Sequence, residues 1–299
     1  MIFRRLSASE NSLTRPLYES VFTEDDRQFV DYYYQWKVRD SRIYVAEDEN
    51  GIHSMVHLNP FRVSVCKELH TLHYIVAVAT QEAYRHRGLM RTLLTLAEQD
   101  MEKDGEPFTF LMPASEKIYA PFGYRYFAVQ KRGWLRTAGG ACVRQESQMV
   151  CRPARPQEYA ALAAFVNDSL SGMYDVFIYR DAAYYERLCA EQRCQNGEVM
   201  VICRPDGKMI GTFCTSQETQ ETGGCELREV IVDPGHREEA LGALAAFAEV
   251  FGDCKVCGYT AQLSLCGEEE VPLLMGKRPG GGIFCSEWKA EKIFINEVV

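Results

Sequence analysis

An apolar run, Tyr74-Ile-Val-Ala-Val-Ala79, constrains the fold of this chain more than any other stretch. An uncharged run of this kind is typical of a strand that is covered on both faces, so it predicts the centre of a sheet. The chain then passes through 80–84 into Arg85-His-Arg-Gly-Leu-Met-Arg91, and residues 87–103 place apolar side chains at helical spacing. The sequence therefore predicts a helix that begins where a central strand ends.

The elements predicted around this strand occur in two successive rounds of similar order, which indicates an internal duplication. For the first round we expect strands at 2–5, 41–46, 52–64, 69–79, 108–112 and 124–135, and helices at 7–20, 24–36, 87–103 and 115–122. For the second we expect strands at 149–155, 199–204, 209–216, 227–232 and 256–261, and helices at 156–170, 181–192 and 236–251.

A stretch of small residues, Thr137-Ala-Gly-Gly-Ala141, separates the two rounds and predicts a domain boundary. We therefore expect a first domain over 1–138, a second over 148–265, and a C-terminal segment over 266–299 that ends in an apolar strand at 292–299.

Composition excludes several classes of protein. No apolar run reaches the roughly 18 residues of a membrane-spanning helix, and the first residues have no signal-peptide core, so we expect a cytoplasmic protein that binds no membrane. The twelve cysteines are then expected to be buried thiols. Residues 1–140 hold 18 basic and 18 acidic residues, so the net charge of −9 comes from residues 141–299. A general nucleic-acid surface is therefore not expected.

The turn after the central strand has the chemistry of a phosphate site. Gly88 lets a ligand approach the backbone, and the free amides of the first helical turn point to the same place. The helix dipole adds about half a positive charge, and Arg85, Arg87 and Arg91 add whole ones. An ordinary strand-to-helix turn with solvated arginines is the alternative that this motif alone leaves open.

A second motif follows at 112–124, Met-Pro-Ala-Ser-Glu-Lys-Ile-Tyr-Ala-Pro-Phe-Gly-Tyr, which predicts a short helix capped by Ser115 with Gly123 at its exit. With both motifs present, the chain resembles the GNAT superfamily of acyl-CoA-dependent N-acetyltransferases. That family has a pyrophosphate turn of the form Arg/Gln-x-x-Gly-x-Gly/Ala and a later Tyr-x-x-x-Gly-Phe/Tyr. The details of both motifs and the tandem order are similar to the Eis-type (enhanced intracellular survival) branch.

The resemblance implies an α/β (α+β) fold of two tandem GNAT-like domains, each a mixed, mostly antiparallel sheet flanked by helices. It implies acetyl-CoA as co-substrate, with the pantetheine arm along the backbone of the central strand, the pyrophosphate at the turn, and two residues of the second motif at the cofactor's border. The cofactor-binding residues implied are Val78, Ala79, Thr80, Arg85, His86, Arg87, Gly88, Leu89, Met90, Arg91, Ser115 and Glu116.

The resemblance also assigns Tyr119 as the general acid. When an amine attacks a thioester directly, a thiolate leaves, and a nearby hydroxyl that returns a proton lowers the barrier. The alternative for Tyr119 is a half-buried aromatic residue with its hydroxyl in solvent.

The chain departs from the family pattern in three respects. Met90 stands where most members have Gly or Ala, and Glu82 replaces the common Pro before the turn. Eis-type chains usually continue into a sterol-carrier-like domain whose terminal carboxylate enters the active site as general base, and this sequence ends before such a domain. The carboxylate of Val299, at the end of an apolar segment, is therefore one candidate base. The other candidates are His57, His73, Glu116 or a chain of waters.

The second round differs in its chemistry. Its equivalent turn places Glu238 and Glu239 at the helix start, where carboxylates repel a pyrophosphate, so we expect a degenerate domain that shapes the substrate cleft or covers the first sheet. A single Cys254-Lys-Val-Cys257 with Cys266 nearby is a poor zinc signal, so we predict no metal.

These observations predict an acetyl-CoA-dependent N-acetyltransferase with a catalytic first half. The acceptor is expected to be a primary amine on a small molecule or peptide, and the acidic second half favours cationic amines such as polyamines or aminoglycosides. A non-catalytic acyl-CoA sensor or assembly module is the alternative, and a longer acyl chain stays open. Self-association into a homo-oligomer also stays open.

Overall fold

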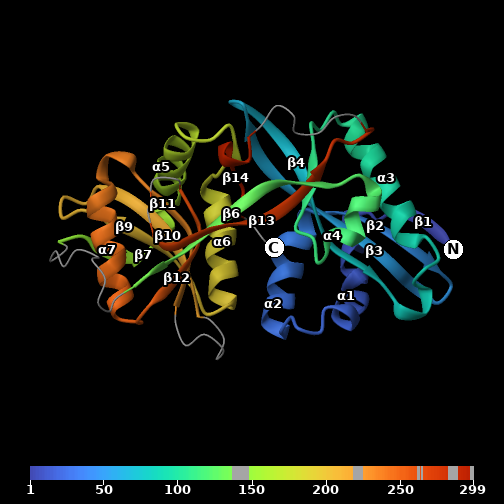
Figure 1. The fold of residues 1–299 in the computed structure, drawn as a ribbon. Helices are drawn as coiled ribbons and strands as arrows, with labels where there is room; N and C mark the ends of the chain where they lie inside the picture. Colours follow the sequence, from blue (N-terminus) through green and yellow to red (C-terminus); the bar gives the residue numbers. More distant parts are fainter. Residues whose placement is uncertain (137–147, 218–224, 261–262, 264, 282–288, 297–299) are drawn as a thin grey trace. The chain divides into compact units, whose positions relative to one another are not determined.

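The computed structural model describes residues 1–136, 148–217, 225–260, 263, 265–281 and 289–296 (Figure 1). The chain divides into two compact units. Unit 1 consists of Met1–Ala128 with the described part of Leu273–Ala290, and unit 2 consists of Val129–Pro272 with Glu291–Asn296. The chain therefore leaves unit 1 within one strand and returns to it within a later one.

Unit 1 contains the following elements in chain order: β1 (Ile2–Arg5), the 3₁₀ helix η1 (Ala8–Thr14), α1 (Arg15–Val21), α2 (Arg27–Tyr32), the π-helical turn η2 (Tyr33–Lys37), the 3₁₀ turn η3 (Val38–Asp40), β2 (Arg42–Asp48), β3 (Gly51–Val65), β4 (Glu68–Thr80), the 3₁₀ turn η4 (Glu82–Tyr84), α3 (Leu89–Lys103), β5 (Thr109–Leu111), α4 (Glu116–Tyr119), the 3₁₀ turn η5 (Ala120–Phe122) and the start of β6 (Arg125–Leu135). The sheet of unit 1 has the strand order β1-β2-β3-β4-β5-β13, in which β13 is Cys266–Lys277.

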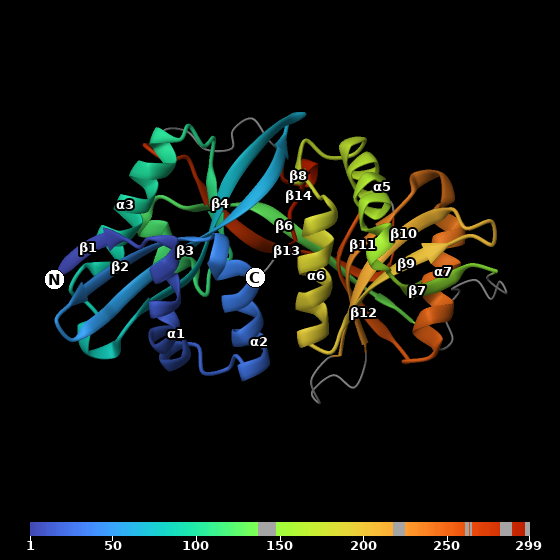
Figure 2. The ribbon, with the colours of Figure 1, turned by 180° about the vertical axis from the view of Figure 1, so that it is seen from behind.

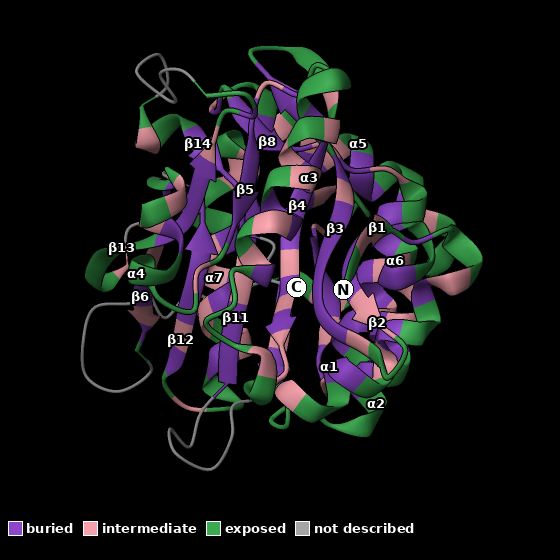
Figure 3. Ribbon diagram, turned by 90° about the vertical axis from the view of Figure 1, so that its right-hand side faces the viewer, coloured by how far each residue is buried: buried purple, intermediate pink, exposed green. Residues whose placement is uncertain are grey.

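Every pair in this sheet is antiparallel except β4 with β5. Alternate residues of the strands face opposite layers of helices. Val56 and Leu58 of β3 pack in one cluster with Leu93 of α3, whereas His57 stacks against Tyr33, the first residue of η2. One face of the sheet is thus covered by α3 and the other by the α1–α2 region, and Figure 3 shows β3 and β4 as largely buried ribbons.

Unit 2 repeats this plan. Its elements are β7 (Val150–Pro153), the 3₁₀ turn η6 (Pro156–Glu158), α5 (Tyr159–Ser171), β8 (Val176–Ile178), α6 (Ala182–Cys194), β9 (Glu198–Cys203), β10 (Met209–Gln217), β11 (Cys225–Val232), the 3₁₀ turn η7 (Pro234–His236), α7 (Arg237–Glu249) and β12 (Cys254–Tyr259), with the 3₁₀ turn η8 (Ala290–Lys292) and β14 (Ile293–Phe294) near the chain end. Figure 2 shows α5 and α6 beside these strands. The strand order is β7-β9-β10-β11-β12-β6, again antiparallel except for β11 with β12.

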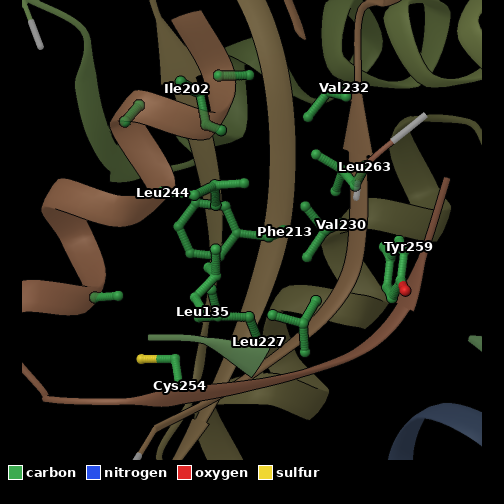
Figure 4. Packing of buried hydrophobic residues seen from close by; sticks show 14 of the residues in the cluster. Leu135, Ile202, Phe213, Leu227, Val230, Val232, Leu244, Cys254, Tyr259 and Leu263 are labelled. Carbon is green, nitrogen blue, oxygen red and sulfur yellow. The ribbon is translucent and has the colours of Figure 1, made fainter. Parts of the chain in front are cut away.

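The core of unit 2 lies between this sheet and α7. Phe213 of β10 is fully buried with Leu227 and Val230 of β11 and with Leu244 of α7 (Figure 4). The two sheets therefore have the same order of strands, and in each the last strand comes from the other round of the sequence: β13 closes unit 1 and β6 closes unit 2.

The central strands of both units carry the same irregularity. Ala77 in β4 and Glu229 in β11 both have a φ of 49°, and at each the register against the preceding strand shifts by one residue. A β-bulge of this kind bends the strand and increases its twist. Its effect on the next strand differs between the units.

In unit 1 the bulge is followed by an opening in the sheet. The only register pair between β4 and β5 is Tyr74 with Phe110, and no other described strand pairs with that side of 75–80. In unit 2, β11 stays paired with β12 past the bulge as far as Val230 and Tyr259, and the Thr260 amide donates to the Val230 carbonyl at 3.0 Å. Among the described residues, the central strand of unit 1 is thus unpaired on this side directly after its bulge, whereas β11 is still paired at Val230.

Most of the predicted elements are confirmed, and several differ in their bounds or type. The helix expected at 7–20 is a 3₁₀ segment followed by α1, because Pro16 favours a helix start. The helix expected from Arg87 begins at Leu89. The strand expected at 292–299 covers only Ile293–Phe294, and 297–299 lie outside the described residues. Strands β8 and β13 were not predicted at all.

The predicted fold class of two tandem units with mixed, mostly antiparallel sheets is confirmed. The predicted segments 1–138, 148–265 and 266–299 divide the chain by sequence, whereas the compact units exchange their last strands, so those bounds remain a proposal. The predicted boundary at 137–141 lies outside the described residues. No helix in the described ranges is long and apolar enough to cross a membrane.

Candidate functional site

The turn between β4 and α3 is held in an unusual backbone conformation. His86 has a φ of 62° and Gly88 a φ of 78°, both in the left-handed region. Glycine adopts this conformation without strain, which explains why it precedes the helix. A Cβ on Gly88 would meet no protein atom within 4 Å, so the space in front of it is open rather than filled by the protein.

The helix that follows begins without a side-chain cap. For the amides of 87–91 the described part of the chain provides no hydrogen-bond partner. Unpaired amides at the start of a 15-residue helix carry a partial positive charge that favours an anion.

The same turn and the first turn of α3 carry three arginines. Arg85, Arg87 and Arg91 are exposed, and within the described ranges none of them pairs with a carboxylate. Arg85 donates from Nε to the Thr80 carbonyl at 3.3 Å, and Arg87 donates from Nη2 to the Ala83 carbonyl at 2.9 Å. The site therefore has uncompensated positive charge, which fits a group with several phosphate oxygens.

An aromatic stack lies under one of these arginines. The ring of Tyr84 is 3.8 Å from the ring of His53 in β3, with 7° between their planes, and the Arg87 guanidinium lies 4.9 Å from the Tyr84 ring centre. Neither His53 nor Tyr84 was predicted from the sequence; the only signal was an aromatic residue in an otherwise polar turn.

The second motif lies beside the first turn of α3. Ser115 is the N-cap of α4, although its side chain makes no capping bond, and Ser115 and Glu116 are both exposed. Phe122 lies under the guanidinium of Arg91 at 4.7 Å. Tyr119 packs in one buried cluster with Leu89, against which Val78 and Met90 also pack. The structure thus brings the two sequence motifs together.

Tyr119 is suited to giving up a proton only when a base forms close to it. Its side chain is buried, and this desolvation raises the pKa of its phenol to about 12. The hydroxyl is therefore protonated at neutral pH. In the described residues it has no hydrogen-bond partner that would compete for its proton.

The predicted backbone contacts Val78, Ala79 and Thr80 lie at the end of β4, beyond the bulge, where no described strand pairs with the side facing β5. An extended chain with amide groups can pair with such an edge. The open edge, the unpaired amides and the guanidinium groups together fit an acyl-CoA: a diphosphate at the turn and an amide-bearing arm along the strand. Bound there, acetyl-CoA would supply an activated thioester.

The candidate bases are placed very differently. His57 is fully buried, and its Nδ1 shares a hydrogen bond with the Tyr33 hydroxyl at 3.1 Å. Because desolvation lowers the pKa of His57 to about 3, it is a poor base. His73 is buried against Glu106, with Nδ1 and Oε1 2.5 Å apart, and is therefore already paired. Glu116 is exposed. Val299 lies outside the described residues.

The equivalent turn in unit 2 has lost these features. Only 233–236 separate β11 from α7, compared with 81–88 in unit 1. The Asp233 carboxylate accepts a bond from the Gly235 amide at 2.9 Å and contacts Nδ1 of His236 at 2.8 Å, and Glu238 and Glu239 follow in the first turn of α7. Protein groups thus occupy the place of an anion.

Comparison with known proteins agrees with this geometry. Residues 3–127 match the family model of the acetyltransferase (GNAT) domain. A search among curated proteins finds no significant match.

The fold is similar to several solved structures at low identity. A probable N-acyltransferase from Enterococcus faecalis V583 has a TM-score of 0.78 at 13% identity, covering 93% of this chain and 72% of that one. Eis1 from Mycobacterium abscessus has a TM-score of 0.62 at 12% identity, covering 92% and 73%. A tandem GNAT protein from the clavulanic acid biosynthesis pathway has a TM-score of 0.59 at 13% identity, covering 94% and 99%.

The open strand, the phosphate-type turn and the tyrosine motif all lie within the matched residues or directly beside them. Residues 3–127 match the model of the GNAT acetyltransferase domain, and the chain as a whole has the fold of tandem GNAT proteins.

Proposed function

We propose that this protein is an acetyl-CoA-dependent N-acetyltransferase that moves an acetyl group to a primary amine. The observation that carries the proposal is the opening of β4 from β5 directly before a turn whose amides are unpaired and whose arginines have no carboxylate partner among the described residues. Acetyl-CoA would be held by the backbone of Val78, Ala79 and Thr80 and by the turn 85–91. Ser115 and Glu116 would border it.

Tyr119 is the proposed general acid. Its raised pKa keeps the phenol protonated at neutral pH, and its place beside Leu89 connects it to the start of α3. A protonated hydroxyl near the departing sulfur can donate its proton at the moment a thiolate forms. For the general base, the carboxylate of Val299 remains our proposal, and removal of residues 298 and 299 is its test: an unchanged rate would rule it out.

Unit 2 is proposed to bind no acyl-CoA. Its central strand β11 stays paired with β12 as far as Val230, its turn is shorter, and its carboxylates stand where phosphate oxygens would need donors. It would act as scaffold and, through its acidic residues, favour cationic amines such as polyamines or aminoglycosides. The sequence motifs that resemble the Eis-type branch support placing the protein there, and free cysteines support a cytoplasmic location.

The test is an acetylation assay with the full chain. Acetyl-CoA is incubated with a panel of cationic, neutral and peptide amines, and free thiol is measured against a control without amine. We expect thiol release with at least one amine and loss of release in Tyr119→Phe. Tight binding of coenzyme A with no turnover of any amine would instead favour an acyl-CoA sensor.

A further inference from the structure

A three-layer stack connects β3 to the phosphate-type turn. His53, in β3, forms the lowest layer, Tyr84 the middle and Arg87 the uppermost, with ring centres of the first two 3.8 Å apart and the guanidinium carbon 4.9 Å above the Tyr84 ring. The stack ends one residue before Gly88. It therefore connects the sheet to the residues that would contact an anion.

The lowest layer is rigidly held. His53 is 3% exposed, and both of its ring nitrogens have partners: Nδ1 lies 2.8 Å from Oε1 of Gln81 and Nε2 lies 2.7 Å from Oδ1 of Asp48. The Gln81 amide also donates to the His53 carbonyl at 2.9 Å. The imidazole cannot rotate without breaking these contacts, so it offers a fixed flat surface to Tyr84.

The upper layer is exposed and has no carboxylate partner among the described residues. A solvated arginine side chain samples many rotamers, and fixing it on a ligand costs conformational entropy. A ring beneath the guanidinium, together with the bond from Nη2 to the Ala83 carbonyl at 2.9 Å, restricts that freedom before any ligand arrives.

We propose that Tyr84 is a positioning residue that, clamped by His53, presents the Arg87 guanidinium to a phosphate group of coenzyme A beside the amides of Gly88 and the first turn of α3. This inference rests on the proposed function, because it takes coenzyme A as the ligand. Tyr84 itself touches no phosphate in this arrangement. It acts by holding Arg87 in a conformation ready to bind.

The test is the dissociation constant of coenzyme A, measured by calorimetry on the full chain. Arg87→Met removes the charge and is expected to raise Kd by about ten- to a hundredfold. Tyr84→Leu removes the ring and is expected to raise Kd by about two- to fivefold, whereas Tyr84→Phe keeps the ring and leaves Kd unchanged. Tyr126→Leu, at an exposed tyrosine of the same unit, is the matched control.

A double-mutant cycle separates positioning from a general structural effect. If Tyr84 acts through Arg87, then Tyr84→Leu has no further effect on Kd in the Arg87→Met background. If Tyr84→Leu does not fold, Arg87→Lys tests whether stacking on Tyr84 matters, because lysine keeps the positive charge but has no planar group to stack on the ring. A rise in the Kd for coenzyme A is again expected.

The ligand can be shortened to locate the phosphate. With 3′-dephospho-coenzyme A, the Tyr84→Leu effect disappears if Arg87 faces the 3′-phosphate and persists if it faces the diphosphate; both outcomes support the proposal. Pantetheine has neither the 3′-phosphate nor the diphosphate, and its affinity can be measured in competition with acetyl-CoA. Tyr84→Leu is expected to leave that affinity unchanged.

Three results would overturn the inference while wild-type protein still binds coenzyme A: an unchanged Kd in Tyr84→Leu, additive effects in the cycle, or an equal effect on pantetheine. A wild-type protein that does not bind coenzyme A would instead refute the proposed function.

Discussion

At the residue scale, the site depends on one backbone position. Gly88 has a φ of 78° and open space where a Cβ would stand. Gly88→Ala is expected to cost about 1–2 kcal/mol of stability through backbone strain. It should also raise the Kd for coenzyme A by about tenfold or more, because the methyl group would enter the space proposed for the phosphates.

The matched control for this change is Gly105→Ala at the other end of α3. Gly105 has a φ of 72° and likewise no atom within 4 Å of its virtual Cβ. A similar loss of stability with an unchanged Kd is expected. Equal effects of the two substitutions on Kd, measured by calorimetry, would contradict the assigned site.

Tyr119 provides a second prediction at this scale. Tyr119→Phe is expected to lower kcat by about 10²–10⁴-fold and to leave the KM for acetyl-CoA nearly unchanged, because only the proton donor is lost. Tyr126→Phe, at an exposed position, is the control. Because desolvation raises the pKa of Tyr119 to about 12, wild-type kcat should show no loss from this phenol below about pH 10. A Tyr119→Phe variant with wild-type kcat would contradict the role.

The contacts that hold His53 beneath Tyr84 predict that the stability of the protein depends on pH. Burial opposes a charge on His53, but its bonds to Asp48 and Gln81 outweigh burial and raise its pKa above the ordinary 6.5. The bond from His53 lowers the pKa of Asp48 below 3.8. The contribution of His53 to the free energy of unfolding is therefore complete below pH 6.5 and is lost as the pH rises through its pKa in the folded protein. The contribution of Asp48 is lost as the pH falls below 3.8.

Thermal unfolding tests the direction of the pH dependence that His53 gives to stability. The difference in Tm between wild type and His53→Gln should be largest near pH 5–6 and should shrink toward pH 8–9. A difference that grows with rising pH would show that the imidazole is neutral in the folded protein.

Sequence reasoning works at this scale where a motif is local and fails where partners come from far along the chain. Gly88, the three arginines and Tyr119 were all identified within short motifs. The positive φ of Ala77 and His86 has no marker in the residue type, and His53 lies 31 positions before its stacking partner Tyr84.

At the scale of elements, β4 and β11 share the same bulge but differ in the side chain that stands at it. Both are bulged at φ 49°, but Ala77 in β4 is replaced in β11 by Glu229, whose Oε2 lies 2.7 Å from Nη2 of Arg180. The side chain of Arg180 is 1% exposed and that of Glu229 12%. A buried ion pair therefore occupies the bulge in unit 2.

Removing one partner of this pair leaves a buried charge. Glu229→Leu is expected to lower the free energy of unfolding by about 3–5 kcal/mol, and the double variant Arg180→Met/Glu229→Leu by less than the single one. The exposed pair Arg193–Glu198, with side chains 53% and 40% exposed, is the control, and its loss should cost under about 1 kcal/mol. Urea unfolding measures the free energy of unfolding of the single variant, the double variant and the control. Equal losses for the buried and exposed pairs would contradict the account.

Element prediction from sequence succeeded for strongly periodic or apolar segments and failed for β13. This strand begins with Cys266-Gly-Glu-Glu-Glu270, which is exposed and charged, so it has no alternating pattern until Leu273. Its end pairs with β5, more than 150 residues earlier in the chain, and no local signal identifies such a partner. The helix periodicity of α3, by contrast, gave its end at Lys103.

At the scale of the whole molecule, exchange of the last strands makes each unit depend on the other half of the sequence. β13 pairs with β5, and Lys277 extends to Glu98 of α3, with Nζ and Oε2 2.6 Å apart. The fragment 1–138 should therefore lack its last strand, and circular dichroism should show it to be unfolded although it contains both sequence motifs. Joining 273–290 to residues 1–128 through a flexible linker should restore folding. A cooperatively folded 1–138 fragment would contradict the exchange.

The central claim is that one unit has a phosphate cradle and the other does not. Hydrogen exchange of the full chain with and without coenzyme A tests it most directly. The account predicts that coenzyme A protects the amides of 86–91 and of 77–80, and leaves the equivalent segment 229–240 unchanged. Protection of 229–240, or no protection at 86–91 under saturating coenzyme A, would contradict it.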